Sequence, residues 1–233
     1  MSLLFAHDYR ALVIGAHGAI GQAFCHALQQ DPLCVHLEAV SRTSEGGFDL
    51  RDARSIAAQA QACAAAGPYH VMVDATGALT IDGVGPEKSL AALQPAQLAQ
   101  AFALNAIGPA LVLRHFAPLL APGASIYAKL SARVGSISDN RKGGWYGYRA
   151  SKAALNMLLQ TAAIELQRKN ALLRVVALQP GTVRSDLSGP FAAGVAQLLE
   201  PAESVAGMLA ALKALAPRPG AVFIDYQGQE IAW

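Results

Sequence analysis

Short apolar runs alternate with longer helical stretches along almost the whole chain, and this alternation limits the folds that it can adopt. The apolar runs are bounded by glycine, proline or polar residues, which is typical of buried strands. We predict seven strands, at residues 11–15, 35–41, 48–50, 70–76, 125–131, 173–180 and 221–226. Helical patterns lie between most of them, at residues 19–30, 52–67, 95–120, 145–169 and 203–215. Such alternation predicts an α/β fold, a doubly wound parallel sheet covered by helices on both faces.

Composition restricts the class of protein further. The chain has 233 residues, of which 53% are hydrophobic and 15% charged, so we expect one folded domain over residues 1–233. The formal net charge is +2 and the basic residues are scattered, which argues against a nucleic-acid partner. No apolar run reaches membrane-spanning length without polar interruption, and the start lacks a signal-peptide pattern, so we expect no membrane partner.

Cysteine and histidine usage points to a reducing compartment without a metal site. Cys25, Cys34 and Cys63 are odd in number, and their spacing fits neither a disulfide framework nor a zinc site. Small buried thiols suit a cytoplasmic protein. The histidines are dispersed, with no pair at metal-binding spacing.

A glycine-rich loop follows the first predicted strand and opens the first helix. Its glycines are Gly15, Gly18 and Gly21. In this context the first suits a tight turn, the second lets the backbone approach a pyrophosphate, and the third allows close packing of helix on strand. The helix start then offers free N–H groups to phosphate. This pattern predicts a Rossmann-like dinucleotide site.

The end of the second strand indicates which dinucleotide binds. An acid there would hold the ribose 2′-hydroxyl of NAD, but this chain has Ser41 and Arg42, and Glu38 falls inside the strand. A guanidinium and a hydroxyl suit a 2′-phosphate better, so we favour NADP(H), with NAD(H) as the alternative. His17, in the glycine loop, either faces the adenosine side or is exposed to solvent.

Tyr148 precedes Lys152 by four residues in a predicted helix. Residues four apart lie on one helix face, so a phenol and an ammonium group can share a site there. The alternative is an ordinary surface pair. An ammonium group beside a phenol would lower the pKa of the phenol from its usual value of about 10.

Taken together, these features resemble the short-chain dehydrogenase/reductase family over nearly the whole chain. Within it, residues 132–156 and 225–233 are most similar to the C-factor-like (CsgA-like) and sniffer-type carbonyl reductase branches. Further matching segments are Asp49, which resembles an adenine-contacting acid, residues 74–77 (DATG), Asn105 and residues 180–186 (PGTVRSD). The resemblance implies that the cofactor contacts Gly15, His17, Gly18, Ile20, Gly21, Ser41, Arg42, Asp49, Ala75, Thr76, Gly77, Tyr148, Lys152, Pro180, Gly181 and Val183.

The resemblance also implies a reaction. Tyr148 would act as general acid in carbonyl reduction and as base in alcohol oxidation. Lys152 would lower the pKa of Tyr148 and hold the nicotinamide ribose, and Asn105 would place a water near Lys152 or bridge helix and strand. The expected substrate is a small, uncharged apolar carbonyl or alcohol. A loop over about residues 180–200 would cover it, with Leu187 and Phe191 as lining, and Trp145 and Tyr146 either line the pocket or pack at a subunit edge.

The chain departs from the family at three places. Ala19 shifts the glycine spacing, Asp74 replaces a usual asparagine, and Ala132 stands where the catalytic serine is expected. Ser131 and Ser136 are the candidates to replace that serine, with Ser138 as a further possibility. Because of Ala132, a cofactor-binding signalling or regulatory protein with little turnover is the alternative function. The Ala/Leu-rich helix at 145–169 also predicts a homodimer or homotetramer.

Overall fold

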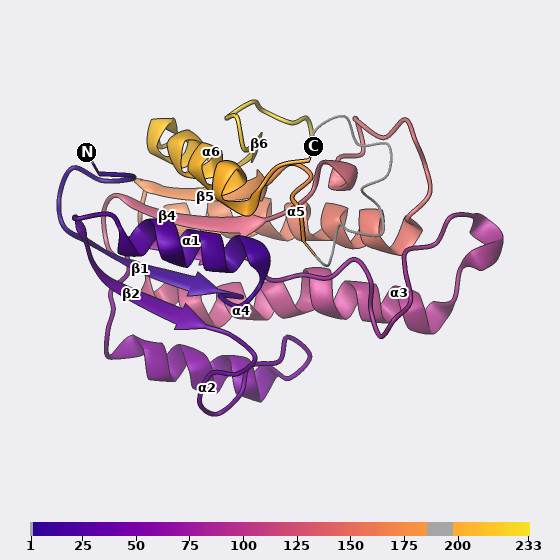
Figure 1. Ribbon diagram of the computed structural model, residues 1–233, viewed down its shortest axis with the longest axis horizontal. Helices are drawn as coiled ribbons and strands as arrows, with labels where there is room; N and C mark the ends of the chain where they lie inside the picture. Colours follow the sequence, from indigo (N-terminus) through magenta and orange to yellow (C-terminus); the bar gives the residue numbers. More distant parts are fainter. Residues whose placement is uncertain (1, 186–197) are drawn as a thin grey trace.

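In a computed structural model that describes residues 2–185 and 198–233, a single parallel sheet forms the centre of the molecule (Figure 1). Among the described residues it has six strands, in the order β2-β1-β3-β4-β5-β6. Every neighbouring pair of strands is parallel. The strands are β1 (Tyr9–Ile14), β2 (Cys34–Val40), β3 (Val71–Asp74), β4 (Ser125–Leu130), β5 (Leu173–Gln179) and β6 (Ala221–Asp225).

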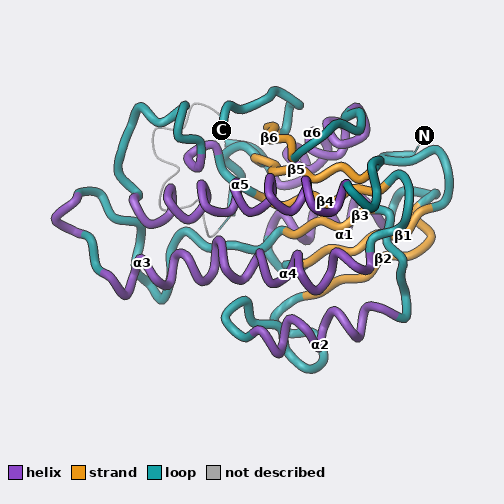
Figure 2. The backbone as a smooth tube through the Cα atoms, turned by 180° about the vertical axis from the view of Figure 1, so that it is seen from behind, coloured by secondary structure: helices purple, strands orange, loops and turns teal. Residues whose placement is uncertain are grey.

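Helices cover both faces of this sheet, as the sequence predicts. On one face lie α1 (Ala19–Gln29) and α6 (Pro201–Ala214), in front of the sheet in Figure 1. On the other lie α2 (Ala53–Ala64), α4 (Gly108–Phe116) and α5 (Tyr146–Gln167). Figure 2 views the molecule from this side. A helix α3 (Pro95–Phe102) leads through a π-helical turn, Ala103–Ile107, into α4. Short 3-10 helices cover Leu90–Ala92, Ala117–Leu119 and Arg133–Gly135.

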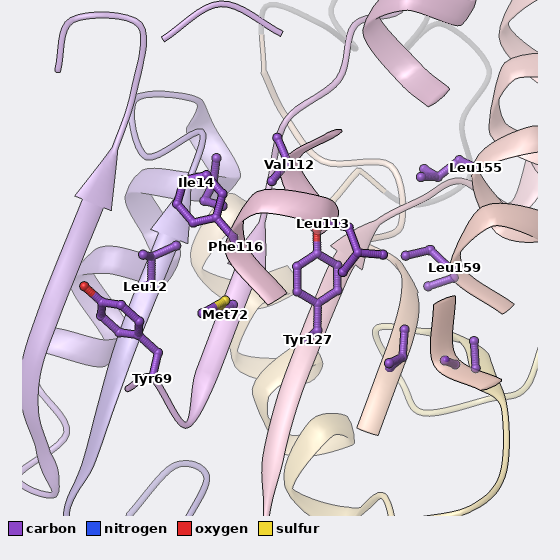
Figure 3. Packing of buried hydrophobic residues seen from close by; sticks show 14 of the residues in the cluster. Leu12, Ile14, Tyr69, Met72, Val112, Leu113, Phe116, Tyr127, Leu155 and Leu159 are labelled. Carbon is purple, nitrogen blue, oxygen red and sulfur yellow. The ribbon is translucent and has the colours of Figure 1, made fainter. Parts of the chain in front are cut away.

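Each strand contributes side chains to two separate hydrophobic cores, because successive residues of a strand point to opposite faces. In β1, Leu12 and Ile14 belong to the core under α2, α4 and α5, whereas Ala11 and Val13 belong to the core under α1 and α6. Figure 3 shows the first of these cores around Phe116. Burial on both faces explains why the strands read as nearly continuous apolar runs.

The prediction of seven strands is wrong by one, because residues 48–50 do not form a strand. Phe48 is buried in the core, but the backbone of Asp49 is used in the turn that leads into α2. Its N–H donates to the Ser55 hydroxyl at 3.0 Å, and its carbonyl accepts from the Asp52 N–H at 3.0 Å. These groups are therefore satisfied without a neighbouring strand.

The stretch Pro95–Leu119 is long and apolar enough to cross a membrane by length and composition alone. Buried core helices of soluble proteins have the same length and composition. Here Val112 and Phe116 of this stretch pack in the core against the sheet. Within the described ranges, no group of three or more His, Cys, Asp and Glu side chains is placed to hold a metal ion.

Candidate active site

The candidate site lies where the order of strands reverses. The chain passes from β1 to β2 on one side, and the next strand, β3, lies on the other side of β1. In parallel sheets a crevice opens outside the carboxyl ends of the strands at such a point. Residues 15–21 follow β1, and residues 74–77 begin with the last residue of β3. The fold thus brings together the two segments predicted to meet the cofactor.

Glycine serves a different physical purpose at each of the three positions of the loop. Gly15 has φ +86°, and a Cβ atom there would lie 3.0–3.2 Å from backbone atoms of Ala75 and Thr76. A Cβ atom at Gly21 would lie 2.1 Å from the Gly15 oxygen, so the close packing of α1 requires glycine. A Cβ atom at Gly18 would meet only the Gly15 oxygen, at 3.5 Å, which leaves open space over this part of the loop.

The start of α1 beside that open space fits an anion. The helix begins at Ala19, with Gly18 as its N-cap and no side chain capping it. Ile20 lies in the first turn. Free N–H groups and the positive end of the helix dipole attract phosphate at such a start. The residues present therefore fit a dinucleotide pyrophosphate.

A chain of polar side chains connects the glycine loop to the end of β2. The buried Ser41 hydroxyl lies 3.1 Å from the Thr43 hydroxyl, which lies 3.0 Å from Nδ1 of His17. Arg42 is exposed beside them. Thr43 is absent from the sequence-based candidates, although the polar run SRTS after the strand is a signal that could have indicated it. His17 is thus exposed to solvent, one of the two alternatives considered for it, and its ring contacts a residue that follows β2.

Asp49 is held by the residues that follow it. It accepts from the Arg51 N–H at 2.9 Å and pairs with the Arg51 side chain at 3.3 Å. The Arg51 N–H and, with smaller contributions, the guanidinium groups of Arg51 and Arg42 hold the pKa of this carboxyl below its usual value. Asp49 is half-exposed, so it remains accessible.

Asn105 lies in the π-helical turn and is fully buried. Its Oδ1 accepts from the Ala78 N–H at 2.9 Å, and its Nδ2 donates to the Ala78 carbonyl at 2.8 Å. The side chain therefore bridges a helix and the segment after β3, one of the two roles considered for it. Single π-helical turns are frequent at functional sites.

Tyr148 and Lys152 lie one turn apart on α5, and the Lys152 Nζ is 5.8 Å from the centroid of the Tyr148 ring. Lys152 is buried, and its Nζ donates to the Leu130 carbonyl at 3.2 Å. Gly77 adjoins both Lys152 and Asn105, since a Cβ atom on it would be 3.3 Å from the Lys152 Nζ and 3.1 Å from the Asn105 Oδ1. An ordinary surface pair is thereby excluded.

The expected direction of the Tyr148 pKa is wrong for this structure. Burial raises the pKa of Tyr148 to about 12. Burial, and secondarily repulsion from Lys129, lowers the pKa of Lys152 to about 7, against a smaller opposing effect of Asp74. The physical reason is that both groups are desolvated, and that Lys152, with a pKa of about 7, is only partly charged at neutral pH and does not offset the effect of burial on Tyr148.

A carboxylate from the segment after β3 fixes the start of α5. The Glu87 carbonyl accepts from the Trp145 N–H at 2.5 Å, and its Oε2 accepts from the Gly147 N–H at 3.0 Å. Trp145 has φ +54°, and a Cβ atom on Gly147 would lie 2.9 Å from Glu87 Oε1. Glu87 is buried and absent from the sequence-based candidates, and only its position in the fold reveals it. It positions the first turn of the helix that carries Tyr148.

Both candidates to replace the missing serine already donate hydrogen bonds to other groups. The Ser131 hydroxyl donates to Asn156 Oδ1 at 2.7 Å, and the Ser136 hydroxyl donates to the Ala232 carbonyl. Ser138 donates to the Trp233 carbonyl at 2.8 Å. The structure thus uses these hydroxyls to hold α5 and the end of the chain.

The segment after β5 lies partly outside the described residues. Gly181 has φ +79°, and the Pro180 carbonyl accepts from the Ser204 hydroxyl of α6 at 2.6 Å. Val183 is buried and forms a bridge with Leu199. Leu187 and Phe191, the predicted lining of the substrate loop, fall in the part that is not described.

A small pocket opens beside Tyr148. Its walls are mostly apolar, but Glu87, Gln97 and Asn105 also line it, so it is less uniformly apolar than the sequence suggests. The lining residues are Ala78, Leu79, Ile81, Val84, Pro86, Glu87, Gln97, Ala101, Asn105 and Tyr148.

Comparisons with known proteins identify the family and the fold of this chain. The sequence model of the short chain dehydrogenase family matches residues 9–195. The chain is 36% identical over 168 residues to C-signal of Myxococcus xanthus. The aligned region covers 72% of this chain and 94% of that protein. It also resembles two solved structures in fold. These are the carbonyl reductase Sniffer of D. melanogaster (TM-score 0.84, 21% identity, 97% and 100% of the two chains) and an NADPH-bound carbonyl reductase from chicken fatty liver (TM-score 0.85, 22%, 99% and 96%).

Alanine substitutions at Gly21 and Gly18 should differ in their effect on stability, because a Cβ atom has no room at Gly21 but has room at Gly18. Gly21→Ala is expected to lower the free energy of unfolding by roughly 2 kcal/mol or more, because its Cβ atom would overlap the Gly15 carbonyl. Gly18→Ala is the matched control and should stay within about 0.5 kcal/mol of the wild type. Urea unfolding measures both, and equal stability of the two variants would contradict this packing.

Lys152→Met should stabilise the protein in a pH-dependent way. The folded pKa of Lys152, about 7, lies below its usual value of 10.5, so the unfolded chain binds the proton more tightly. The resulting cost to wild-type stability is full below about pH 7 and disappears towards pH 10.5. Urea unfolding should therefore show the variant more stable by up to roughly 4 kcal/mol at pH 6, with the difference shrinking as pH rises. The exposed Lys169→Met is the control, and a difference independent of pH would refute the prediction.

Proposed function

The chain belongs to the short-chain dehydrogenase family, and we propose that it is an NADP(H)-dependent oxidoreductase that interconverts a small apolar carbonyl compound and its alcohol. The observation that carries this proposal is the convergence of Tyr148, buried Lys152 and Asn105 at the turn after β3, which in turn contacts Gly15 of the glycine loop. A surface pair or a purely structural helix would not require these side chains to meet at the carboxyl edge of the sheet.

The cofactor is proposed to lie across the crevice between β1 and β3. The glycine loop and the start of α1, with Gly18 and Ile20, would receive the pyrophosphate. Asp49 would face the adenine, and residues 75–77 and 180–183 would line the nicotinamide half. When bound, the nicotinamide supplies or accepts the hydride.

A preference for NADP(H) is supported by the polar group at the end of β2. Arg42 is exposed beside the connected side chains of Ser41, Thr43 and His17. A guanidinium with neighbouring hydroxyls and a ring N–H matches a phosphate dianion. Residues 41–44, which follow β2, include no carboxylate that could bind the hydroxyls of a ribose. The NADPH-bound carbonyl reductase of the same fold is consistent with this preference.

Proton transfer is assigned to Tyr148. With its pKa raised to about 12 by burial, the hydroxyl carries its proton at neutral pH, and this is the proton that it would pass to a carbonyl oxygen. Lys152 would hold the nicotinamide ribose and, when charged, favour the phenolate needed for alcohol oxidation. Since Ser131 and Ser136 bind other groups, orientation of the carbonyl falls mainly to Tyr148.

The remaining organisation follows from the same site. We propose a single dinucleotide-binding domain, because one sheet carries both halves of the site, and a substrate loop at about residues 180–200. Three free cysteines favour the cytoplasm. Apolar side chains exposed on α5, among them Met157, Leu158 and Ile164, favour a homodimer or homotetramer.

The second candidate function is a cofactor-binding signalling protein with little turnover. Two observations favour it, the alanine at position 132 and the 36% identity to C-signal over most of the chain. It predicts NADPH binding without reduction of any carbonyl compound.

Arg42→Ala should weaken binding of NADPH by roughly tenfold or more and leave binding of NADH nearly unchanged, because one charge-assisted contact with the 2′-phosphate is lost. Fluorescence titration with each cofactor measures this. Arg54→Ala, which removes a fully exposed arginine at the start of α2, is the control. Equal weakening for both cofactors would remove Arg42 from the phosphate site.

Tyr148→Phe should lower kcat for NADPH-dependent carbonyl reduction by at least about a hundredfold while NADPH still binds, since only the proton donor is removed. Tyr146→Phe, the same change two residues earlier on α5, should keep most of the activity. A wild type that binds NADPH but reduces nothing in a broad carbonyl panel would favour the signalling function instead.

A further inference from the structure

A second lysine is buried under the site, and the proposed reaction does not use it. Lys129 of β4 lies directly opposite Asp74 of β3 in the strand register. Both side chains are fully buried, and the Lys129 Nζ is 2.9 Å from Asp74 Oδ1. Burying two charges costs several kcal/mol per ion, and an apolar pair of similar size is often at least as stable. Stability alone therefore gives little reason for this ion pair.

Lys129 also holds the turn that follows β3. Its Nζ donates to the Thr76 carbonyl at 2.6 Å and to the Thr76 hydroxyl at 2.9 Å. Asp74 Oδ1 accepts from the Thr76 N–H at 2.9 Å and from the Thr76 hydroxyl at 2.6 Å. Each member of the ion pair thus binds the same residue, which fixes the turn from two sides.

This turn adjoins Lys152. Gly77, the next residue, faces the Lys152 Nζ, with 3.3 Å between that nitrogen and the position of an added Cβ atom. Lys152 in turn donates to the carbonyl of Leu130, the residue after Lys129. The Lys129 ammonium group therefore binds the turn that follows β3, and the Lys152 ammonium group binds the last residue of β4.

We propose that Lys129, paired with Asp74, is a positioning residue of this site: it fixes residues 74–77 against Lys152 and keeps a second positive charge close to it. This inference rests on the proposed function, because it concerns the same site. It also accounts for Asp74, which replaces the asparagine usual in the family that the chain resembles.

The charges near Lys152 shift its pKa in opposite directions. Lys129 lowers the pKa of Lys152 and Asp74 raises it, with Lys129 the stronger of the two. Tyr148 faces Lys152 on the same helix, and Tyr127 faces Asp74 from β4, with its hydroxyl 3.5 Å from Asp74 Oδ2. Burial raises the pKa of Tyr127 and of Tyr148, so both are neutral at physiological pH. Substituting Lys129 or Asp74 therefore changes the charge near Lys152 only through the ion pair, and not through these tyrosines.

The test compares Lys129→Met, Asp74→Asn and the double variant in the full chain. The pH dependence of NADPH binding, followed by fluorescence, reports the ionisation of Lys152, and kcat/KM for carbonyl reduction is followed in parallel. Lys129→Met should move the alkaline loss of NADPH binding to higher pH by on the order of one unit, because a repelling charge is removed. Asp74→Asn should move it to lower pH. A merely structural pair would not shift the profile in opposite directions.

The double variant keeps the proposal testable if either single variant fails to fold. Without an unpaired buried charge, its Tm should return to within a few degrees of the wild type. It still lacks the bond from Lys129 to Thr76, so it should bind NADPH roughly tenfold more weakly at every pH. A double variant that folds and binds NADPH as the wild type does would overturn the proposal.

Two further outcomes separate this inference from the proposed function. Opposite shifts in NADPH binding without reduction of any carbonyl would support the role of Lys129 and refute the oxidoreductase. Normal carbonyl reduction with unshifted profiles in every folded variant would refute the role of Lys129 and leave the oxidoreductase intact.

Discussion

The close approach of backbone to backbone at the end of β1 is the constraint on which the rest of the site depends. Gly15 lies against the backbone of Ala75 and Thr76, and Gly21 lies against Gly15 itself, so no side chain fits at either position. This contact holds the start of α1 beside the turn after β3. Because the strands in the described part of the chain are all parallel, the later ones bring Leu130 and Pro180 to the same edge.

The site is also unusual in how much charge it buries. Lys152, Lys129 and Asp74 are buried close to the carboxyl ends of β3 and β4, and Glu87 is buried at the start of α5. Each is bound by hydrogen bonds to backbone or to an opposite charge, as low-dielectric surroundings require. Burial pushes the pKa values of Lys152 and Tyr148 in directions that favour their neutral forms.

Several site residues could be predicted because their local sequence has a direct physical meaning. Strand, glycine loop and helix in succession indicate phosphate binding, and four-residue spacing places Tyr148 and Lys152 on one face. Other features depended on partners far along the chain. Glu87 binds Gly147 across 60 residues, Lys129 binds Asp74 across 55, and Ser136 reaches Ala232 across 96. No local pattern in a single sequence specifies such contacts.

The sequence by itself determined the α/β class, the order of elements and the place of the dinucleotide loop, because periodicity and glycine placement act over a few residues. Only the tertiary structure decided that residues 48–50 form no strand, since the backbone of Asp49 bonds within the turn to α2. It also decided the ionisation of Tyr148 and Lys152. Their pKa values depend on desolvation and on charges from other strands, and both exist only once the sheet has assembled.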